Sequence, residues 1–227
     1  MRPMSHPEPG SADDRLGLAD WRRRIADLYA EVRATVATDP EAAWQRWRDV
    51  REELFRTHSH SPVPATARGA FRARHWPYDP ALRMRAALLD EADDPGHGVR
   101  LSTMPGLTLQ LPMSVGEALD FRRIGWVELP FAAGSRRLAI YWMAGYAGGL
   151  FLPFRDTTNG DATYAAGRYL LDTAKSADLG AEPDGRLILD FNFAFHPSCA
   201  FDPVWSCPLA PPENRLDIPI EAGERLR

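Results

Sequence analysis

Four polar side chains occupy alternating positions in two segments that we expect to be strands. Tyr164 and Arg168 lie in one segment, and Asp190 and Asn192 lie in the next. Residues two or four apart share one face of a strand, so pairing of the two strands would bring the four groups together. A guanidinium beside carboxylate, amide and phenol groups can bind a polar or anionic ligand. An ordinary half-exposed sheet shows the same alternation, so these residues could instead be the polar, solvent-facing side of a sheet.

The same groups allow a catalytic interpretation. Asp190 would be the general base, and Tyr164 or Arg168 would stabilise developing negative charge. Four substrate-binding residues are predicted. Arg168 lies in the first strand segment, Asn192 in the second, and Asn214 and Arg215 in the loop after it. The chain contains no Gly-X-Ser-X-Gly elbow, so a serine nucleophile has little support.

A proline-rich stretch, residues 195–216, carries the remaining reactive groups. Five prolines there indicate a rigid, irregular loop. His196, Cys199 and Cys207 allow three interpretations. They could be part of a metal site, although a convincing fourth ligand is missing, or the cysteines could be a redox pair without Cys-X-X-Cys spacing. We favour the third, in which both cysteines are small buried packing residues.

Composition excludes several classes of protein. The 227 residues are 44% hydrophobic and 26% charged, with a net charge of −4 and two cysteines. A disordered chain, a disulfide-stapled miniprotein and an electrostatic nucleic-acid binder are therefore not expected. The most apolar stretch, residues 138–154, is interrupted by glycines and a proline, so we expect no membrane span and a cytoplasmic location. No dinucleotide or phosphate-loop glycine motif is present, and the cofactor and the oligomeric state stay unknown.

The N-terminal part is predicted to be helical. Residues 1–18 have the composition of a disordered tail, and a first helix is expected to begin at Asp20. Asp39 is the expected cap of a second helix, with Pro40 at its first position. That helix should end near Ser59, because the following prolines cannot continue it. We thus predict a helical segment over residues 19–60 within one domain, 19–227.

The remainder, residues 80–227, has the pattern of an antiparallel sheet. Short apolar runs separated by Gly, Asn, Asp or Pro predict eight strands: 82–89, 98–104, 107–111, 119–130, 137–146, 149–155, 162–171 and 186–195. Helices followed by strands predict an α+β fold, with N-terminal helices packed on a meander or a barrel-like sheet and a Pro-rich C-terminal loop. Asn159-Gly160 predicts a two-residue hairpin turn that sets Arg155 opposite Tyr164 and Phe151 opposite Arg168.

A long motif covers residues 154–170 and continues over residues 189–224, with further matches at 51–62 and 78–80. In this motif the chain resembles a bacterial and archaeal family known as domain of unknown function 1684, over about residues 20–227. Eight polar or sulfur-containing side chains fit the family pattern: Tyr164, Arg168, Asp190, Asn192, Cys199, Cys207, Asn214 and Arg215. The resemblance implies no activity, but it favours a pocket formed by the shared polar residues.

His196 stands where this family is expected to have asparagine, which weakens the metal and Cys-His interpretations. Three functions follow. The favoured one is binding of a small polar or anionic molecule in a pocket of the β-rich part. The alternatives are an enzyme that uses Asp190 in the same pocket, and a protein-interaction module whose interface contains Trp21, Trp44 and Trp47.

Overall fold

Two helices joined by a short turn open the part of the chain that the structure describes. This computed structural model describes residues 12–89, 109–116, 119–145 and 148–226. Helix α1 spans Ala12–Thr35 and helix α2 spans Pro40–Thr57. The Asp39 carboxylate accepts a hydrogen bond from the Ala42 N–H at 3.0 Å, which confirms the predicted cap of α2.

Helix α1 begins earlier than Asp20, and it includes part of the segment predicted to be a disordered tail. Two acidic side chains hold this first stretch against the end of α2. Asp14 lies 3.2 Å from Nε2 of His60, and Asp20 lies 3.3 Å from Nε2 of His58. Each histidine lies about 40 residues after its aspartate in the sequence, so local composition gave no sign of the pairing.

The helix tryptophans face the interior. Trp47 is fully buried and donates to the Tyr29 hydroxyl at 3.1 Å, and Trp44 is 5% exposed and donates to the Asn192 carbonyl at 3.0 Å. The Trp21 ring stacks on Phe55 at a centroid distance of 5.9 Å. Trp44 and Trp47 therefore belong to the core and the partly buried Trp21 packs against it, so the predicted interaction surface on the helices loses its basis.

The described strands are β1 (Arg74–His75), β2 (Arg83–Ala86), β3 (Leu109–Leu111), β4 (Leu119–Phe131), β5 (Gly134–Met143), β6 (Gly149–Phe154), β7 (Arg168–Asp172), β8 (Leu187–Asp190) and β9 (Glu224–Arg225). Short 3-10 turns follow or join them: η1 (Arg68–Ala70), η2 (Pro80–Leu82), η5 (Thr173–Lys175), η6 (Phe191–Phe193), η7 (Ser198–Ala200) and η8 (Pro212–Asn214). None of the helices among these residues has the length and apolar character needed to cross a membrane.

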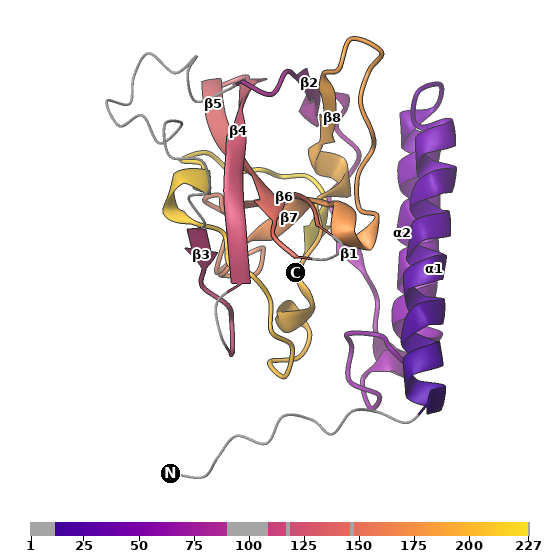
Figure 1. Ribbon diagram of the computed structural model, residues 1–227. Coiled ribbons are helices and arrows are strands. Elements are labelled where there is room, and N and C mark those ends of the chain that lie inside the picture. Colours follow the sequence, from indigo (N-terminus) through magenta and orange to yellow (C-terminus); the bar gives the residue numbers. More distant parts are fainter. Residues whose placement is uncertain (1–11, 90–108, 117–118, 146–147, 227) are drawn as a thin grey trace.

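The main sheet is an open antiparallel meander with the order β3-β4-β5-β6-β7, and two small sheets pair β2 with β8 and β1 with β9. This confirms the predicted α+β fold with a mainly antiparallel sheet. It excludes the barrel-like alternative for the described strands, because β3 and β7 are opposite edges of the sheet. Figure 1 shows the helices as a layer on one side of the β-rich part, with β4 and β5 far from them.

Two apolar clusters hold these layers together. One joins the inner faces of α1 and α2 to one set of sheet residues, among them Phe121, Tyr141 and Phe151. The other lies against β2, β8 and the C-terminal segment, and includes Leu152, Phe191 and Ile220. Residues that alternate along β5 belong to different clusters, so both faces of this sheet are covered.

The predicted two-residue hairpin at Asn159-Gly160 is wrong. Strand β6 pairs with β7 so that Phe154 lies opposite Arg168 and Phe151 lies opposite Asp172. The intervening loop turns at Gly160, whose φ is +88°, but side chains shape it. Asp156 Oδ1 accepts the Thr158 N–H at 2.8 Å, and these internal bonds replace the strand pairing that a tight turn would require.

The last predicted strand, 186–195, is shorter than expected. Strand β8 ends at Asp190, whose carboxylate accepts the Asn192 N–H at 3.0 Å and starts the η6 turn. Strand β7 likewise begins at Arg168 rather than at residue 162. The predicted strand 98–104 lies outside the described residues. The strands predicted over 119–130, 137–146 and 149–155 match β4, β5 and β6 closely.

A glycine comparison tests the tight contact at the start of β7. A Cβ added at Gly167, where φ is +103°, would lie 2.4 Å from the Phe154 carbonyl oxygen. Gly160 has a similar φ, but its Cβ would meet nothing within 4 Å. We expect Gly160→Ala to lower the free energy of unfolding by about 1 kcal/mol and Gly167→Ala by roughly 3 kcal/mol, measured by urea denaturation. Equal losses would show that the Gly167 contact carries no energy.

Candidate functional site

The four polar groups predicted to form one cluster are separated in the fold. Strand β8, with Asp190, pairs with β2, while β7, with Arg168, pairs with β6. The backbones of the two segments are joined at Tyr169 and Phe195, which exchange hydrogen bonds of 2.9 and 3.1 Å. The pairing of Arg83 with Asp190 explains this separation. Strand β2 occupies the edge of β8 that the prediction assigned to β7.

Arg168 lies in the interior with no exposed surface. Its Nη2 donates to Asp156 Oδ2 and to the Ile220 carbonyl, both at 2.8 Å, and its Nη1 donates to the carbonyls of Ala222 and Glu224. The guanidinium thus fastens the C-terminal segment to the sheet. We therefore reassign Arg168 from ligand binding to the structural core.

Asp190 and Asn192 fasten a second segment. Asp190 is 1% exposed, and its Oδ2 lies 3.4 Å from both Arg83 Nη1 and the Tyr78 hydroxyl. Asn192 exchanges two 2.8 Å hydrogen bonds with the backbone of Asp79. Burial raises the pKa of Asp190, against hydrogen bonds from Asn192 that lower it. All these partners belong to the protein, which leaves the Asp190 carboxylate no position from which to act on a substrate.

Asn214 is also structural. Its Oδ1 accepts the Ala139 N–H at 2.7 Å, and its Nδ2 donates to the carbonyls of Ala139 and Pro153 at 2.9 and 2.7 Å. The side chain thereby joins η8 to β5 and β6, and its amide groups are fully used. Asn192 and Asn214 are thus both buried with backbone partners, and neither lines the cavity described next.

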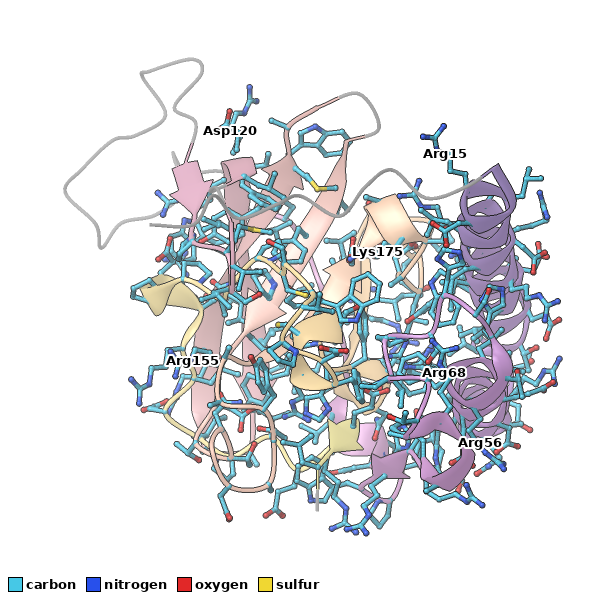
Figure 2. All side chains as sticks on the ribbon, turned by 90° about the horizontal axis from the view of Figure 1, so that it is seen from below. Arg15, Arg56, Arg68, Asp120, Arg155 and Lys175 are labelled. Carbon is cyan, nitrogen blue, oxygen red and sulfur yellow. The ribbon has the colours of Figure 1, made fainter. Side chains whose placement is uncertain are left out.

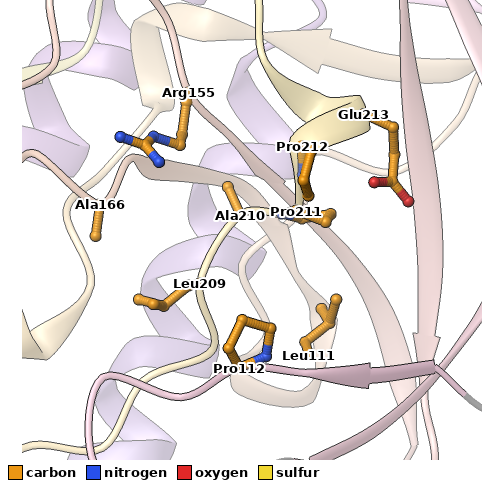
Figure 3. A pocket seen from close by; sticks show the side chains of 9 residues that line it. All are labelled: Leu111, Pro112, Arg155, Ala166, Leu209, Ala210, Pro211, Pro212 and Glu213. Atoms are coloured by element: carbon orange, nitrogen blue, oxygen red, sulfur yellow. The ribbon is translucent and has the colours of Figure 1, made fainter.

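A cavity of about 420 Å³ lies at one edge of the main sheet, next to the Pro-rich loop. Its lining, drawn in Figure 3, comes from the end of β3, the β6–β7 loop and the loop before β9: Leu111, Pro112, Arg155, Ala166, Leu209, Ala210, Pro211, Pro212 and Glu213. Most of these side chains are apolar, and two carry charge. This volume and character are typical of small-molecule sites.

The two charged groups of the cavity differ in their partners. Glu213 accepts a 2.7 Å hydrogen bond from the Tyr141 hydroxyl, and its carboxylate lies 3.9 Å from Arg123 Nη1. The half-buried Arg155 side chain has neither an ion pair nor a hydrogen bond within the described part of the chain. Figure 2 shows Arg155 at the outer edge of the molecule, away from the helices.

Arg215 lies beside Arg155. The two residues form a parallel bridge in which the Arg155 N–H donates to the Asn214 carbonyl at 2.9 Å and Leu216 donates to the Arg155 carbonyl at 2.8 Å. Bridge partners carry their side chains on the same side of the ladder. Arg215 is exposed, and its side chain too has no partner among the described residues. Two arginines whose side chains have no partner among the described residues are therefore neighbours in the chain fold, and Arg155 is the one that lines the cavity.

Of the predicted site residues, Arg215 lies next to Arg155 but outside the cavity lining, and Tyr164 donates its backbone N–H to Nε2 of His196. Sequence reasoning missed Arg155 as a binding residue. The sequence feature that could have identified Arg155 is its position, because it is the first charged residue after the apolar run Gly149–Phe154. A side chain at the end of a buried strand often lies at the edge of a sheet, where sites form.

The cysteines of the Pro-rich loop form a separate cluster of buried free thiols. Cys207 Sγ accepts the Cys199 N–H at 3.3 Å, and the Cys207 N–H donates to the Ser114 hydroxyl at 3.0 Å. A hydrogen bond from the Cys207 thiol lowers the pKa of Cys199 to about 6, with further help from the hydroxyls of Ser114 and Tyr164 and against the effect of burial.

His196 does not join this cluster as a base. Its Nε2 accepts the Tyr164 N–H at 3.2 Å, and its Nδ1 lies 3.6 Å from the Glu224 carboxylate. A Cys-His pair is thereby excluded for the described geometry. In the described ranges, no three His, Cys, Asp or Glu side chains are grouped as metal ligands.

Comparisons with known proteins agree with the resemblance in the sequence. The family model for proteins of unknown function named DUF1684 matches residues 72–225, which excludes the two helices. A solution NMR structure of an uncharacterized protein from Haloarcula marismortui is 28% identical, with a TM-score of 0.56, and the match covers 83% of this chain and 95% of that one. No curated protein matches the chain.

Proposed function

Because this chain belongs to DUF1684, a family of proteins of unknown function, we propose a function from its own cavity: it binds a small molecule with an anionic group and an apolar body. Arg155 would hold the anionic group, with Arg215 as a second donor at the rim. The apolar body would contact the leucine and proline side chains of the lining.

One observation supports this proposal above the others, namely the unpartnered guanidinium of Arg155 on an apolar wall. Other arginines of the sheet have acidic partners: Arg136 lies 2.6 Å from Asp217, and Arg168 lies 2.8 Å from Asp156. A guanidinium presents a planar set of donors that matches a carboxylate or phosphate in two parallel hydrogen bonds. An anion supplied by a ligand would give Arg155 the partner that the described residues do not provide.

Charge balance around the cavity also favours an anionic ligand. Glu213 is the acidic side chain of the lining, and the Tyr141 hydroxyl and Arg123 already occupy it. Arg155 and Arg215 therefore leave this edge locally positive, although the whole chain has a net charge of −4. A cationic ligand would meet two guanidiniums without an available carboxylate.

The two alternative functions have less support. Asp190 is buried among protein partners and does not line the cavity, which removes the proposed general base. Trp44 and Trp47 are core residues, which removes the proposed interaction surface. We retain the cytoplasm as the expected location, since Cys199 and Cys207 are free thiols of the kind that a reducing compartment maintains.

Matched pairs of ligands test the proposal. Thermal shift and calorimetric titration would compare benzoate, phenylacetate, hexanoate and octanoate with their uncharged amides. We expect at least one carboxylate to stabilise the protein while its amide does not, because only the carboxylate can pair with Arg155. Equal binding of an acid and its amide throughout the set, or binding of neither, would contradict an anion site.

Substitution of Arg155 is the second test. Arg155→Gln should weaken binding of the best carboxylate by about 10- to 100-fold, the value of a charged hydrogen-bonded pair, without changing the unfolding midpoint. Arg215→Gln should weaken binding less, because Arg215 lies outside the lining. Arg136→Gln, which alters a surface ion pair with Asp217, is the matched control and should bind normally. Unchanged affinity in Arg155→Gln would assign the ligand to another place.

A further inference from the structure

The small sheet formed by β1 and β9 carries two arginines that lie outside the lining of the cavity. In its register Arg74 lies opposite Arg225, and His75 lies opposite Glu224. Opposed residues carry their side chains on the same face of a ladder, and successive residues alternate between its faces. Both arginines are exposed, whereas His75 and Glu224 are buried. The outer face of this ladder therefore presents two guanidiniums to solvent.

The inner face holds the ladder in place. Glu224 Oε1 accepts a 2.7 Å hydrogen bond from Arg51 of α2, and its Oε2 accepts the His196 N–H, also at 2.7 Å. The Trp76 N–H donates to the Gly223 carbonyl at 3.2 Å and extends the pairing by one position. The backbone that carries the two arginines is thereby tied to a helix and to a loop, which keeps them cross-strand neighbours.

The two arginines lack an acidic partner. Like charges in directly opposed positions repel one another and weaken a ladder. Neither guanidinium has an ion pair or a hydrogen bond among the residues that the structure describes, although Cζ of Arg225 lies 5.9 Å from the centroid of the Trp76 ring. Glu224 is bonded on the inner face, and Glu52 of α2 accepts the Ala73 N–H at 3.0 Å. An anion from outside the described residues would relieve this repulsion.

A phosphate group matches two opposed guanidiniums better than a carboxylate does. It carries a charge of about −1.5 to −2 at neutral pH and has three acceptor oxygens, so it can bond to both groups at once. A carboxylate has one charge and two oxygens, and a single guanidinium satisfies both of them. The arginine pair of the ladder therefore favours a phosphate, whereas Arg155 stands alone among the residues of the apolar lining.

We propose that the outer face of the β1–β9 ladder binds a phosphate group between Arg74 and Arg225, either as inorganic phosphate or as part of a small phosphomonoester. The bound anion neutralises the repulsion across the ladder, and because it binds only the folded chain it stabilises the fold. This site is separate from the cavity, and its ligand is independent of the one proposed there.

Thermal unfolding of the full-length protein at about pH 7.5 tests the proposal. Inorganic phosphate and glycerol phosphate are the probes, each at about 10 mM, with sodium chloride of equal ionic strength as the reference. We expect at least one probe to raise the unfolding midpoint by about 2–4 °C. A response to one probe alone identifies whether the free ion or the ester is bound. The absence of a response to both would overturn the proposal.

Substitution of Arg74 separates a bound phosphate from a general salt effect. Arg74→Gln should abolish the response to phosphate, yet in low-salt buffer without phosphate it should unfold at no lower temperature than wild type, because it removes a repulsion. Arg74→Glu sets a carboxylate opposite Arg225, so it should raise the midpoint by about 1–3 °C and also abolish the response. Arg22→Gln, which removes an exposed arginine of α1, is the matched control and should respond as wild type does.

Two further variants decide between this site and the cavity. Arg225→Gln should abolish the response to phosphate in the same way as Arg74→Gln. Arg155→Gln should keep the response to phosphate, and Arg74→Gln should keep the binding of carboxylates. A response to phosphate that persists in Arg74→Gln, or one that is lost only in Arg155→Gln, would overturn the site on the ladder without affecting the function proposed for the cavity.

Discussion

Arg168→Met is expected to lower the free energy of unfolding by about 3–5 kcal/mol, enough to unfold a marginally stable domain. Arg168 and Asp156 have no exposed side-chain surface and lie 2.8 Å apart. The substitution leaves the Asp156 carboxylate buried without its cation and also removes the donors of the carbonyls at Ile220, Ala222 and Glu224. Urea denaturation followed by circular dichroism measures the loss.

Two further variants identify the cause of the stability loss in Arg168→Met. Arg136→Met removes an exposed pair with Asp217 and should cost less than about 1 kcal/mol. The double variant Asp156→Asn with Arg168→Met should lower the free energy of unfolding by less than the sum of the two single changes, because the pair shares one interaction. A stability of Arg168→Met within 1 kcal/mol of wild type would return Arg168 to the list of ligand-binding candidates.

Stability should fall steeply between pH 7 and pH 5, by about 2 kcal/mol for each of two histidines. Burial lowers the pKa of His75 and of His196 to about 4, although the Glu224 carboxylate opposes this shift. In the unfolded chain both rings bind a proton near pH 6.5. The unfolded state therefore holds more protons over this window, and acid favours unfolding.

The surroundings of these histidines explain why their pKa values are lowered so far. Both ring nitrogens of His75 are buried without a hydrogen-bond partner in the described residues, and the nearby charges include Arg48 and Arg51 as well as Glu224. Arg51 forms a 2.7 Å ion pair with Glu224, so the single carboxylate is already shared. A proton on either ring would add a buried positive charge beside these arginines.

The pH prediction is checked by urea denaturation at pH 7, 6 and 5, where ordinary carboxylates keep their charge. The pKa of Glu224 is lowered to about 2, mainly by Arg51 acting against its burial, so its contribution to stability is lost only below this window, as pH falls from about 4.5. His196→Asn should reduce the fall in the free energy of unfolding by about 2 kcal/mol, since one of the two histidine sites is removed. A slope that the substitution does not change would rule out His196 as one of the groups.

The local elements could be predicted from the sequence. The start of α2 follows from Asp39 and Pro40, because a cap and a proline act on their own backbone neighbours. The ranges of β4, β5 and β6 follow from apolar alternation and turn residues. The family motif identified the chain for the same reason, since it is a property of residue order alone.

The partners of these elements could not be predicted in this way. Strand β8 pairs with β2, which lies about a hundred residues earlier, and backbone hydrogen bonds carry no label that selects one edge over another. Whether Arg168 is exposed or buried depends on which segment covers β7. That segment, residues 220–224, lies more than fifty residues later in the sequence. Tertiary packing therefore decides that Arg168 is a core residue and that Arg155 lines the cavity with no side-chain partner in the part of the chain that the structure describes. Sequence determines which groups are available, whereas burial and pairing decide which of them already have a partner within the protein.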